Sequence, residues 1–210
     1  SNNRITQFKY ENTLISNIYD VSYNAESLVS KIITTKNASS GVTSFTINYN
    51  YTNNILSQII ITSGSGTSST PFNVTYDSST KTYTIGNSTS TSTYLFKQDN
   101  YGNITEFTYE GLIMTFALNT DAKGIYNGIN NNLPMLLTSL FSGIDATLYY
   151  SHFFANKEIT SFSLTALGIN YDSTLNRDSN TNISEISFTN TFNSEVKLSS
   201  TIEYEERTVN

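Results

Sequence analysis

The stretch DNYGNITEFTYEGLIM, residues 99–114, shows in one short run how this chain folds. After Asp99 comes the predicted turn Asn100–Asn103, in which Asn and Gly tolerate positive φ. The segment Ile104–Tyr109 then has the composition of a strand. Glu110-Gly111 is typical of a tight hairpin turn, and the apolar/polar alternation resumes over Leu112–Met114. The stretch therefore predicts two antiparallel strands joined by a hairpin.

The middle of this stretch, Asn103–Phe107, is one copy of a five-residue unit. The unit reads any residue, then Ile, Leu or Val, then Ser or Thr, then a polar residue, then Ile or Phe. The other copies begin at Arg4, Leu14, Leu28, Ile55, Glu158 and Asn182. Their spacing is irregular, which excludes a propeller or solenoid of fixed period. We predict that each copy starts a strand.

The two apolar positions of the unit lie three residues apart. On a straight strand they would point to opposite faces. Either a β-bulge intervenes, or both faces of the sheet are partly covered, and both alternatives stay open at this point.

Elsewhere apolar and polar residues alternate with a period of two. This pattern predicts strands with one buried and one solvated face, as in an antiparallel sheet. The apolar faces comprise Phe45, Ile47, Tyr49 and Tyr51; Phe72, Val74 and Tyr76; Leu112, Met114, Phe116 and Leu118; Val196 and Leu198; and Ile202 and Tyr204. Asn53-Asn54 and Asp77–Ser79 are predicted turns, and 63–70 and 87–93 are predicted flexible loops.

One segment, 132–143, breaks the strand pattern. Its Leu and Phe residues recur at helical spacing, Pro134 suits a first turn, and Gly143 can end a helix. We predict a short buried helix within an insertion at about 124–145. The helix would plug an open end or face of the curved sheet, and the alternative is that it binds a partner.

The composition suits an exported protein. Charged residues make up 13% of the chain, and Ser, Thr, Asn and Tyr take their place. The net charge is −6 and the eleven Lys and Arg residues are scattered, which argues against nucleic-acid binding. Cysteine is absent, so disulfides, thiol nucleophiles and Cys-type zinc sites are excluded.

No stretch is long and apolar enough for a membrane helix. Ser1-Asn2-Asn3 resembles the polar start of a mature chain whose export signal has been removed.

A family resemblance rests on the run Asp99–Phe107 followed by Tyr109. It resembles a YD-type repeat, with Tyr76-Asp77 and Tyr171-Asp172 as degenerate starts and 201–205 as a closing strand. The chain as a whole is similar to uncharacterised surface lipoproteins of Bacteroidetes type. The resemblance implies an outer-membrane or cell-surface lipoprotein, or a periplasmic one, tethered through a lipidated Cys absent from this sequence. It implies no activity.

Catalytic and metal-binding patterns are weak. His152 is the single histidine, with Asp145 the nearest acid, and no nucleophile-elbow pattern accompanies it. The carboxylate pairs Glu106/Glu110 and Glu158/Glu185, and the cluster Glu203, Glu205 and Glu206, fall at positions expected to face solvent. We therefore predict a protein that is not an enzyme, with no catalytic, metal or cofactor-binding residue assigned and no cofactor.

Asp178–Asn182 spaces its oxygen ligands like the start of a calcium loop. The glycine and the closing glutamate of such a loop are missing. A turn is the alternative reading, and whether Ca²⁺ binds there is left open.

Taken together, the sequence predicts one mainly β domain over residues 1–210. Its antiparallel hairpins would form a meander that makes a curved sheet or half-barrel, with the short buried helix near 132–143, and whether the sheet closes is left open. We expect an exported binding or scaffolding protein whose ligand is a glycan, a lipid or another surface protein. The alternatives are a carrier of an apolar ligand and a carbohydrate-binding module, which needs two exposed coplanar aromatic rings.

Overall fold

The described residues form a sheet of fourteen strands in which each strand pairs antiparallel with the next. The computed structural model describes residues 4–11, 15–89, 93–125, 133–138 and 154–202. The predicted antiparallel meander is confirmed. The strands are β1 Gln7–Glu11, β2 Ile15–Tyr23, β3 Val29–Ala38, β4 Gly41–Thr52, β5 Ile55–Ser63, β6 Phe72–Asp77, β7 Thr82–Asn87, β8 Thr93–Gln98, β9 Ile104–Tyr109, β10 Leu112–Lys123, β11 Lys157–Leu164, β12 Ile169–Arg177, β13 Ile183–Asn190 and β14 Val196–Thr201.

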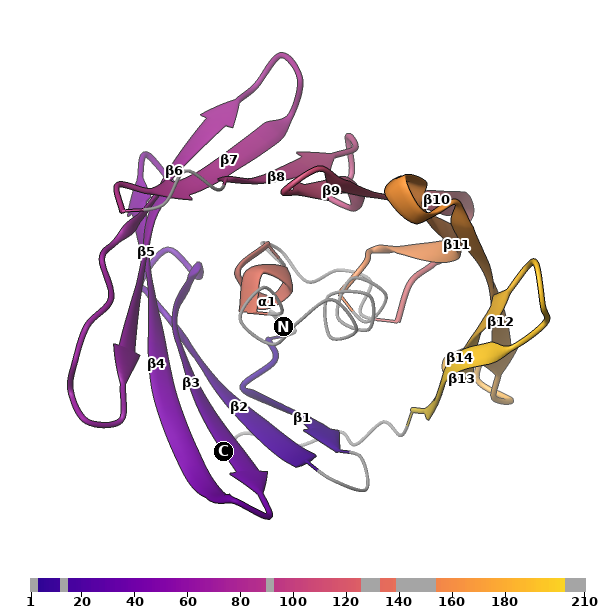
Figure 1. Cartoon of the computed structure of the whole chain (residues 1–210), viewed down its shortest axis with the longest axis horizontal. Helices are drawn as coiled ribbons and strands as arrows, with labels where there is room; N and C mark the ends of the chain where they lie inside the picture. Colours follow the sequence, from indigo (N-terminus) through magenta and orange to yellow (C-terminus); the bar gives the residue numbers. More distant parts are fainter. Residues whose placement is uncertain (1–3, 12–14, 90–92, 126–132, 139–153, 203–210) are drawn as a thin grey trace.

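The sheet curls into an open ring around the helix α1, Leu133–Thr138 (Figure 1). β1 and β14 form its two edges, and no pairing joins them within the described residues. The inner face carries the predicted apolar positions, among them Ile47, Val74 and Met114, all of which are buried. The outer face carries their polar neighbours, such as Thr46 and Asn48. Period-two alternation thus places one apolar face inside the ring and one polar face outside it.

The five-residue unit is a β-bulge at the start of a strand. On β9, Glu106 pairs with Lys97 and Ile104 pairs with Gln98, so Thr105 has no partner on β8. The extra residue lets Ile104 and Phe107 both reach the buried inner face although they lie three apart. The same shift occurs in the copies that begin at Leu28, Ile55, Glu158 and Asn182. Of the two explanations left open by the sequence, the structure shows the bulge.

The hydroxyl of the bulged residue explains why the unit requires Ser or Thr. An unpaired residue leaves a carbonyl on the neighbouring strand short of a donor. In four copies the hydroxyl of the extra residue supplies that donor at 3.1 to 3.3 Å. The pairs are Ser30 with the Ser22 carbonyl, Ser57 with Asn50, Thr105 with Lys97, and Thr160 with Ala117.

The copy at Leu14 does not share this geometry. Ser16 and Asn17 pair in regular order with Asn37 and Lys36, without a shift. Reading this copy as the same unit was therefore wrong in structural terms, although it does lie at the start of β2. Its match comes from a composition rich in Ile, Ser and Asn.

Three turns share one conformation built around a first Asn or Asp. They are 24–28, 99–103 and 178–182. In each, the first side chain accepts the backbone N–H four residues later, at 2.8 to 2.9 Å. The fourth residue has positive φ in all three: Ser27, Gly102 and Thr181. Each of these turns leads directly into a bulge, so in these three copies the turn and the bulge occur together. Tyr171-Asp172, by contrast, lies within β12 and starts no turn.

The other predicted turns are also present. Asn53-Asn54 and Glu110-Gly111 adopt positive φ at both residues, as in a two-residue type I′ hairpin. The Asp77 carboxylate accepts the Ser79 N–H at 2.9 Å. The segment 63–70, predicted as a flexible loop, is a hydrogen-bonded extension of its hairpin, with the Ser63 N–H bonded to the Thr67 carbonyl at 2.9 Å and the Gly64 N–H to Ser44 at 2.8 Å.

The insertion between β10 and β11 runs over 124–156 and is longer than the 124–145 predicted. Its helix begins at Leu133 and is described to Thr138, while 139–143 lie outside the described residues. Met135 and Leu137 are fully buried, so the predicted buried position is confirmed. Within the described ranges, no helix has the length and apolar character needed to cross a bilayer.

The two ends of the insertion meet at the 99–103 turn. Asn103 is fully buried, and its side-chain oxygen accepts the N–H groups of Asn156 at 2.6 Å and Lys157 at 3.1 Å. The Gly124 N–H bonds to the Asn156 carbonyl at 3.0 Å. A Cβ on Gly124 would lie 2.1 Å from the Ala155 carbonyl oxygen. This close crossing of two chain segments requires glycine and fixes where the insertion enters the ring.

Candidate functional site

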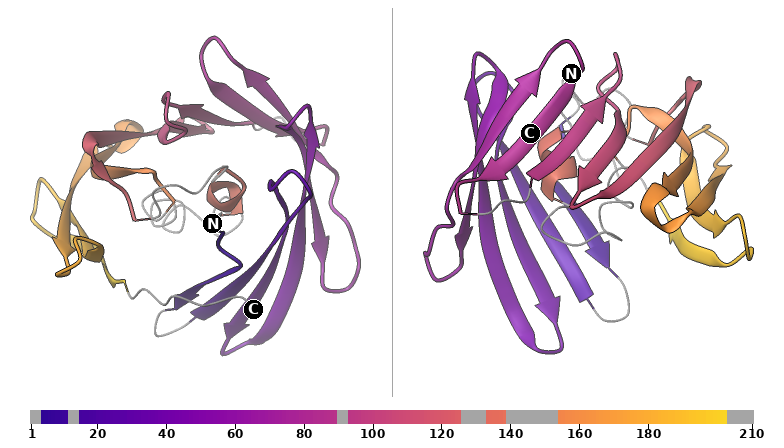
Figure 2. Two further views of the ribbon diagram at one scale, coloured as in Figure 1. Left: turned by 180° about the vertical axis from the view of Figure 1, so that it is seen from behind. Right: turned by 45° about the horizontal axis from the view of Figure 1, so that its top comes forward.

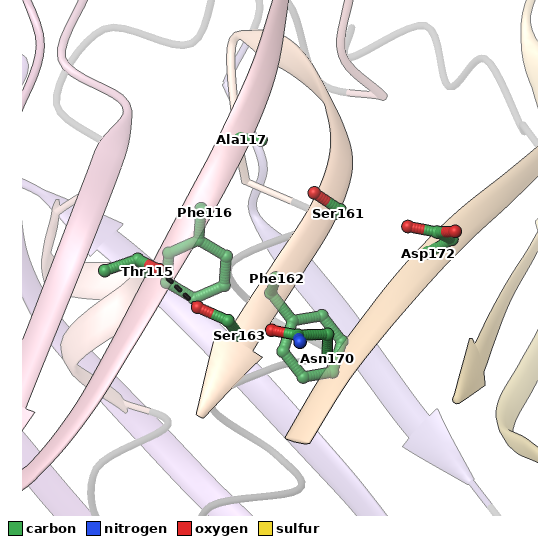
Figure 3. Close-up of a pocket in the computed structure, with 8 residues that line it drawn as sticks. All are labelled: Thr115, Phe116, Ala117, Ser161, Phe162, Ser163, Asn170 and Asp172. Carbon is green, nitrogen blue, oxygen red and sulfur yellow. Dashed lines mark hydrogen bonds between the residues drawn. The ribbon is translucent and has the colours of Figure 1, made fainter. Parts of the chain in front are cut away.

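A groove of about 270 Å³ lies on the outer face of β10, β11 and β12. Strand pairing sets its side chains in two rows across the three strands. One row is Thr115, Ser163 and Asn170, and the other is Ala117, Ser161 and Asp172. Small side chains stand on β10 and β11, which hollows the surface (Figure 3). The intervening Phe116 and Phe162 point to the inner face, where both are buried.

The groove offers hydrogen-bonding groups and one charge. Its floor is closed by a 2.6 Å bond between the hydroxyls of Thr115 and Ser163. The amide of Asn170 lies beyond Ser163 in the same row, and the hydroxyl of Ser161 lies in the neighbouring row. Asp172 is exposed and forms no hydrogen bond or ion pair with the part of the chain that the structure describes. A carboxylate beside several hydroxyls suits a positively charged group with N–H donors.

A second polar arrangement lies inside the ring, where Tyr49 holds the helix. The Tyr49 hydroxyl donates to the Pro134 carbonyl at 2.8 Å and lies 3.1 Å from the Thr138 hydroxyl. Thr138 itself donates to Pro134 at 2.9 Å. Burial raises the pKa of Tyr49 far above its ordinary value, although the bond to Thr138 opposes this. The phenol stays neutral and anchors α1 to β4.

The carboxylates considered from sequence lie at separate positions. Glu106 faces outward on β9 beside Lys97, whereas Glu110 is exposed in the next turn. Glu158 forms an ion pair with Arg177 at 2.6 Å. Glu185 accepts the side-chain amide of Asn176 at 2.7 Å. The structure therefore gives Glu158 and Glu185 separate partners instead of pairing them across a cleft.

The calcium-like segment 178–182 is a self-contained turn. One oxygen of Asp178 accepts the backbone N–H groups of Asn180 and Asn182, each at 2.9 Å. The other is 3.4 Å from the Asn182 amide nitrogen. The turns at Asn24 and Asp99 have the same form, so the turn is the reading that the geometry favours. The described residues contain no group of three His, Asp or Glu side chains placed to share a metal ion.

Other residues considered from sequence lie outside the described residues: His152, Asp145, Glu203, Glu205 and Glu206. The aromatic side chains exposed in the described ranges are Tyr101 and Phe192, 60% and 96% exposed. Tyr101 lies in the β8–β9 turn and Phe192 in the β13–β14 turn. In a meander these turns lie at opposite ends of the strands, so the two rings cannot form one sugar-stacking platform.

Sequence reasoning missed the groove. Its residues come from segments separated by the whole insertion, and small polar residues alternate on almost every strand. The available signal was the run of small or polar outward positions at 115 and 117, 161 and 163, and 170 and 172. That signal becomes informative once β10, β11 and β12 are known to pair.

Comparison with known proteins gives a likeness of structure alone. No protein-family model matches the chain, and no curated protein matches it. Among solved structures, it is similar to a porin-like protein from Bacteroides uniformis ATCC 8492, with 12% identity, 93% of each chain covered and a TM-score of 0.42. A likeness this distant assigns neither a family nor an activity.

Proposed function

We propose that this chain is an exported, non-enzymatic binding protein whose outer groove takes a cationic group displayed by a partner protein. The observation that carries the proposal is the exposed carboxylate of Asp172 beside the hydroxyl of Ser161, in a groove that also holds the hydroxyls of Ser163 and Thr115. A Lys or Arg side chain carries N–H donors that match these acceptors. The groove is slightly smaller than the roughly 300 Å³ at which pockets for small-molecule ligands begin, which suits one side chain.

Charge and surface chemistry support this role. A net charge of −6 attracts a basic partner at long range. The outward residues of β4 are Thr46, Asn48, Asn50 and Thr52, which suit contact with water. In this proposal, attachment to a membrane comes from a lipid anchor.

Several expectations stay predictions. Export, lipid anchoring and kinship with YD-repeat-like lipoproteins rest on composition and resemblance. The carbohydrate-module alternative is weakened because Tyr101 and Phe192 lie in turns at opposite ends of the strands. A carrier that uses the whole ring is disfavoured, because α1 already covers the inner face around Tyr49.

The test is an NMR titration of the ¹⁵N-labelled protein with the peptide acetyl-Gly-Arg-Gly-amide. The matched probe replaces Arg by citrulline, which has nearly the same shape and no charge. We expect the Arg peptide to shift the amide signals of 115–117, 161–163 and 170–172. Asp172→Asn should weaken binding about fivefold, as expected for an exposed ion pair of about 1 kcal/mol.

Ser161→Leu fills the groove and should abolish the shifts. Ser187→Leu, on the outer face of β13 beyond the groove, is the control and should leave them unchanged. Equal binding of the citrulline peptide, or shifts confined to other strands, would refute the proposal.

A further inference from the structure

A polar cluster interrupts the apolar inner face of the sheet between β2 and β3. Thr34 is 2% exposed and lies in line with the buried Ile32. Its hydroxyl forms no hydrogen bond within the described structure, and neither does the buried side-chain oxygen of Asn17. A buried hydroxyl without a partner is destabilising, so each such group needs an explanation, and a bound water or ligand is one.

Strand register places a cation in the same cluster. Asn17 pairs with Lys36, and Tyr19 pairs with Thr34. Because the pairing is regular here, Asn17, Thr34 and Lys36 all belong to the inner face. Lys36 is half-buried and forms no ion pair with a described residue. Directly opposed side chains in a sheet have Cβ atoms roughly 5 Å apart, so the Lys36 ammonium can reach the Asn17 oxygen.

Aromatic rings border this cluster. Phe45 on β4 stands opposite Thr34 and is half-buried. Phe8 stacks on Tyr19 at 4.5 Å between ring centroids and meets Phe154 edge-on at 5.0 Å. The inner face therefore combines a cation, a buried hydroxyl and an apolar aromatic surface within a few residues.

We propose that Asn17, Thr34 and Lys36 bind the head group of a long-chain carboxylate. The Lys36 ammonium and the Thr34 hydroxyl donate to the two carboxylate oxygens. A second hydrogen of the ammonium bonds to the Asn17 oxygen, which satisfies both buried oxygens at once. The alkyl chain packs against Phe8 and Phe45. This site is on the opposite face of the sheet from the outer groove, so it is independent of the function proposed for that groove.

The test measures binding of decanoate, below its micellar concentration, to the full chain by isothermal titration calorimetry. Thr34→Val removes the hydroxyl with little change of volume, and Lys36→Met removes the charge. Hydrogen bonds to charged groups are worth about tenfold or more in affinity, so each variant should bind decanoate at least about tenfold more weakly. Decan-1-ol, which lacks the charge, should bind the unmodified protein about tenfold more weakly than decanoate.

Matched controls lie on the outer face of the same strand. Thr35→Val and Lys31→Met should leave the affinity for decanoate within twofold. A second readout needs no ligand: Thr34→Val should raise the melting temperature, because it replaces an unpaired buried hydroxyl by a methyl group.

Three results of the binding measurements would overturn the proposal. They are no binding of decanoate to the unmodified protein, equal affinities for the inner-face and outer-face variants, and equal affinities for decanoate and decan-1-ol. A lower melting temperature for Thr34→Val would also overturn it, because the hydroxyl would then already have a partner.

Discussion

Deleting Ser57 should be far less harmful than deleting a residue from the middle of a strand. Ser57 is the extra residue of the β4–β5 bulge, since Gln58 pairs with Asn50 and Leu56 pairs with Tyr51. Removing it would make these pairs consecutive. Leu56 and Ile59, now two apart, would keep their places on the inner face. A single-residue deletion normally turns every side chain beyond it to the opposite face.

The expected cost follows from the two hydrogen bonds of the Ser57 hydroxyl. Ser57 donates to the Asn50 carbonyl at 3.1 Å, and Thr52 donates to the Ser57 hydroxyl at 3.2 Å. A hydrogen bond contributes about 1 kcal/mol net, so removing both costs about 2 kcal/mol together. For a chain of this size, about 2 kcal/mol lowers the melting temperature by about 4–8 °C.

Deleting Asn48 is the matched control. It lies on the outer face of β4, where the pairing is regular. Its removal turns outward either Ile47 with Phe45 or Tyr49 with Tyr51. Exposing a fully buried side chain of this size costs about 1.5–3 kcal/mol, so either choice costs roughly 3 kcal/mol or more. For Tyr49, the bonds to α1 would be broken as well.

The assay is thermal unfolding followed by circular dichroism, with urea unfolding to convert midpoints into free energies. The bulge reasoning predicts that the Ser57 deletion folds and loses a few degrees, whereas the Asn48 deletion loses much more or fails to fold. Equal loss of stability in the two deletion variants would refute the bulge reasoning. The face on which the β5 side chains lie would then not depend on the extra residue.

Four further predictions concern single positions. Tyr49→Phe should cost about 1 kcal/mol and lower the melting temperature by about 2–4 °C, whereas the exposed Tyr101→Phe should have no effect. Gly124→Ala should be strongly destabilising in urea unfolding, because the added Cβ would lie 2.1 Å from the Ala155 oxygen. Thr181→Gly should raise the melting temperature by a few degrees, because Thr181 holds φ at 67° and the left-handed region costs a non-Gly residue about 1 kcal/mol. Burial, then the Tyr109 hydroxyl and nearby charges, raises the pKa of Tyr94 to about 12. The folded chain therefore holds this proton more tightly than the unfolded chain, whose tyrosines titrate near pH 10. The stabilisation of the folded state by protonated Tyr94 is complete below pH 10 and is lost as the pH rises to about 12. Melting temperatures measured from pH 9 to 12 should fall less steeply for Tyr94→Phe.

The strands and tight turns could be predicted because their signals are local. Period-two alternation fixes which side chains share a face, as at Phe45, Ile47 and Tyr49. Positive φ at Asn53-Asn54 and Glu110-Gly111 follows from residue type. The helix was recognisable because Leu and Phe residues recur at helical spacing between long runs of strand. These features need no knowledge of distant contacts.

Features that depend on pairing could not be predicted. The groove joins β10 to β12 across the insertion, and the inner cluster depends on Asn17 facing Lys36. The insertion ends at 156 instead of about 145 because its exit is fixed by Asn103 on a different hairpin. The copy at Leu14 shows that the five-residue pattern can also mislead, because the pattern alone does not distinguish a bulge from a regular strand.

The bulges also account for the curvature that the pattern could not specify. The five bulged copies begin β3, β5, β9, β11 and β13, all odd-numbered strands. In an antiparallel meander these strand starts all lie at the same end of the sheet, where the 124–156 insertion also leaves β10. Extra residues at this one end of the strands bend and twist the strands there, which favours a curled sheet over a flat one. A flat sheet of fourteen strands would leave its apolar face in water, whereas a curled one can bury that face against α1 (Figure 2). The Ser/Thr of the unit and the Leu-rich helix are thus complementary, because the bulges curl the sheet and the helix fills part of the space that the curl encloses.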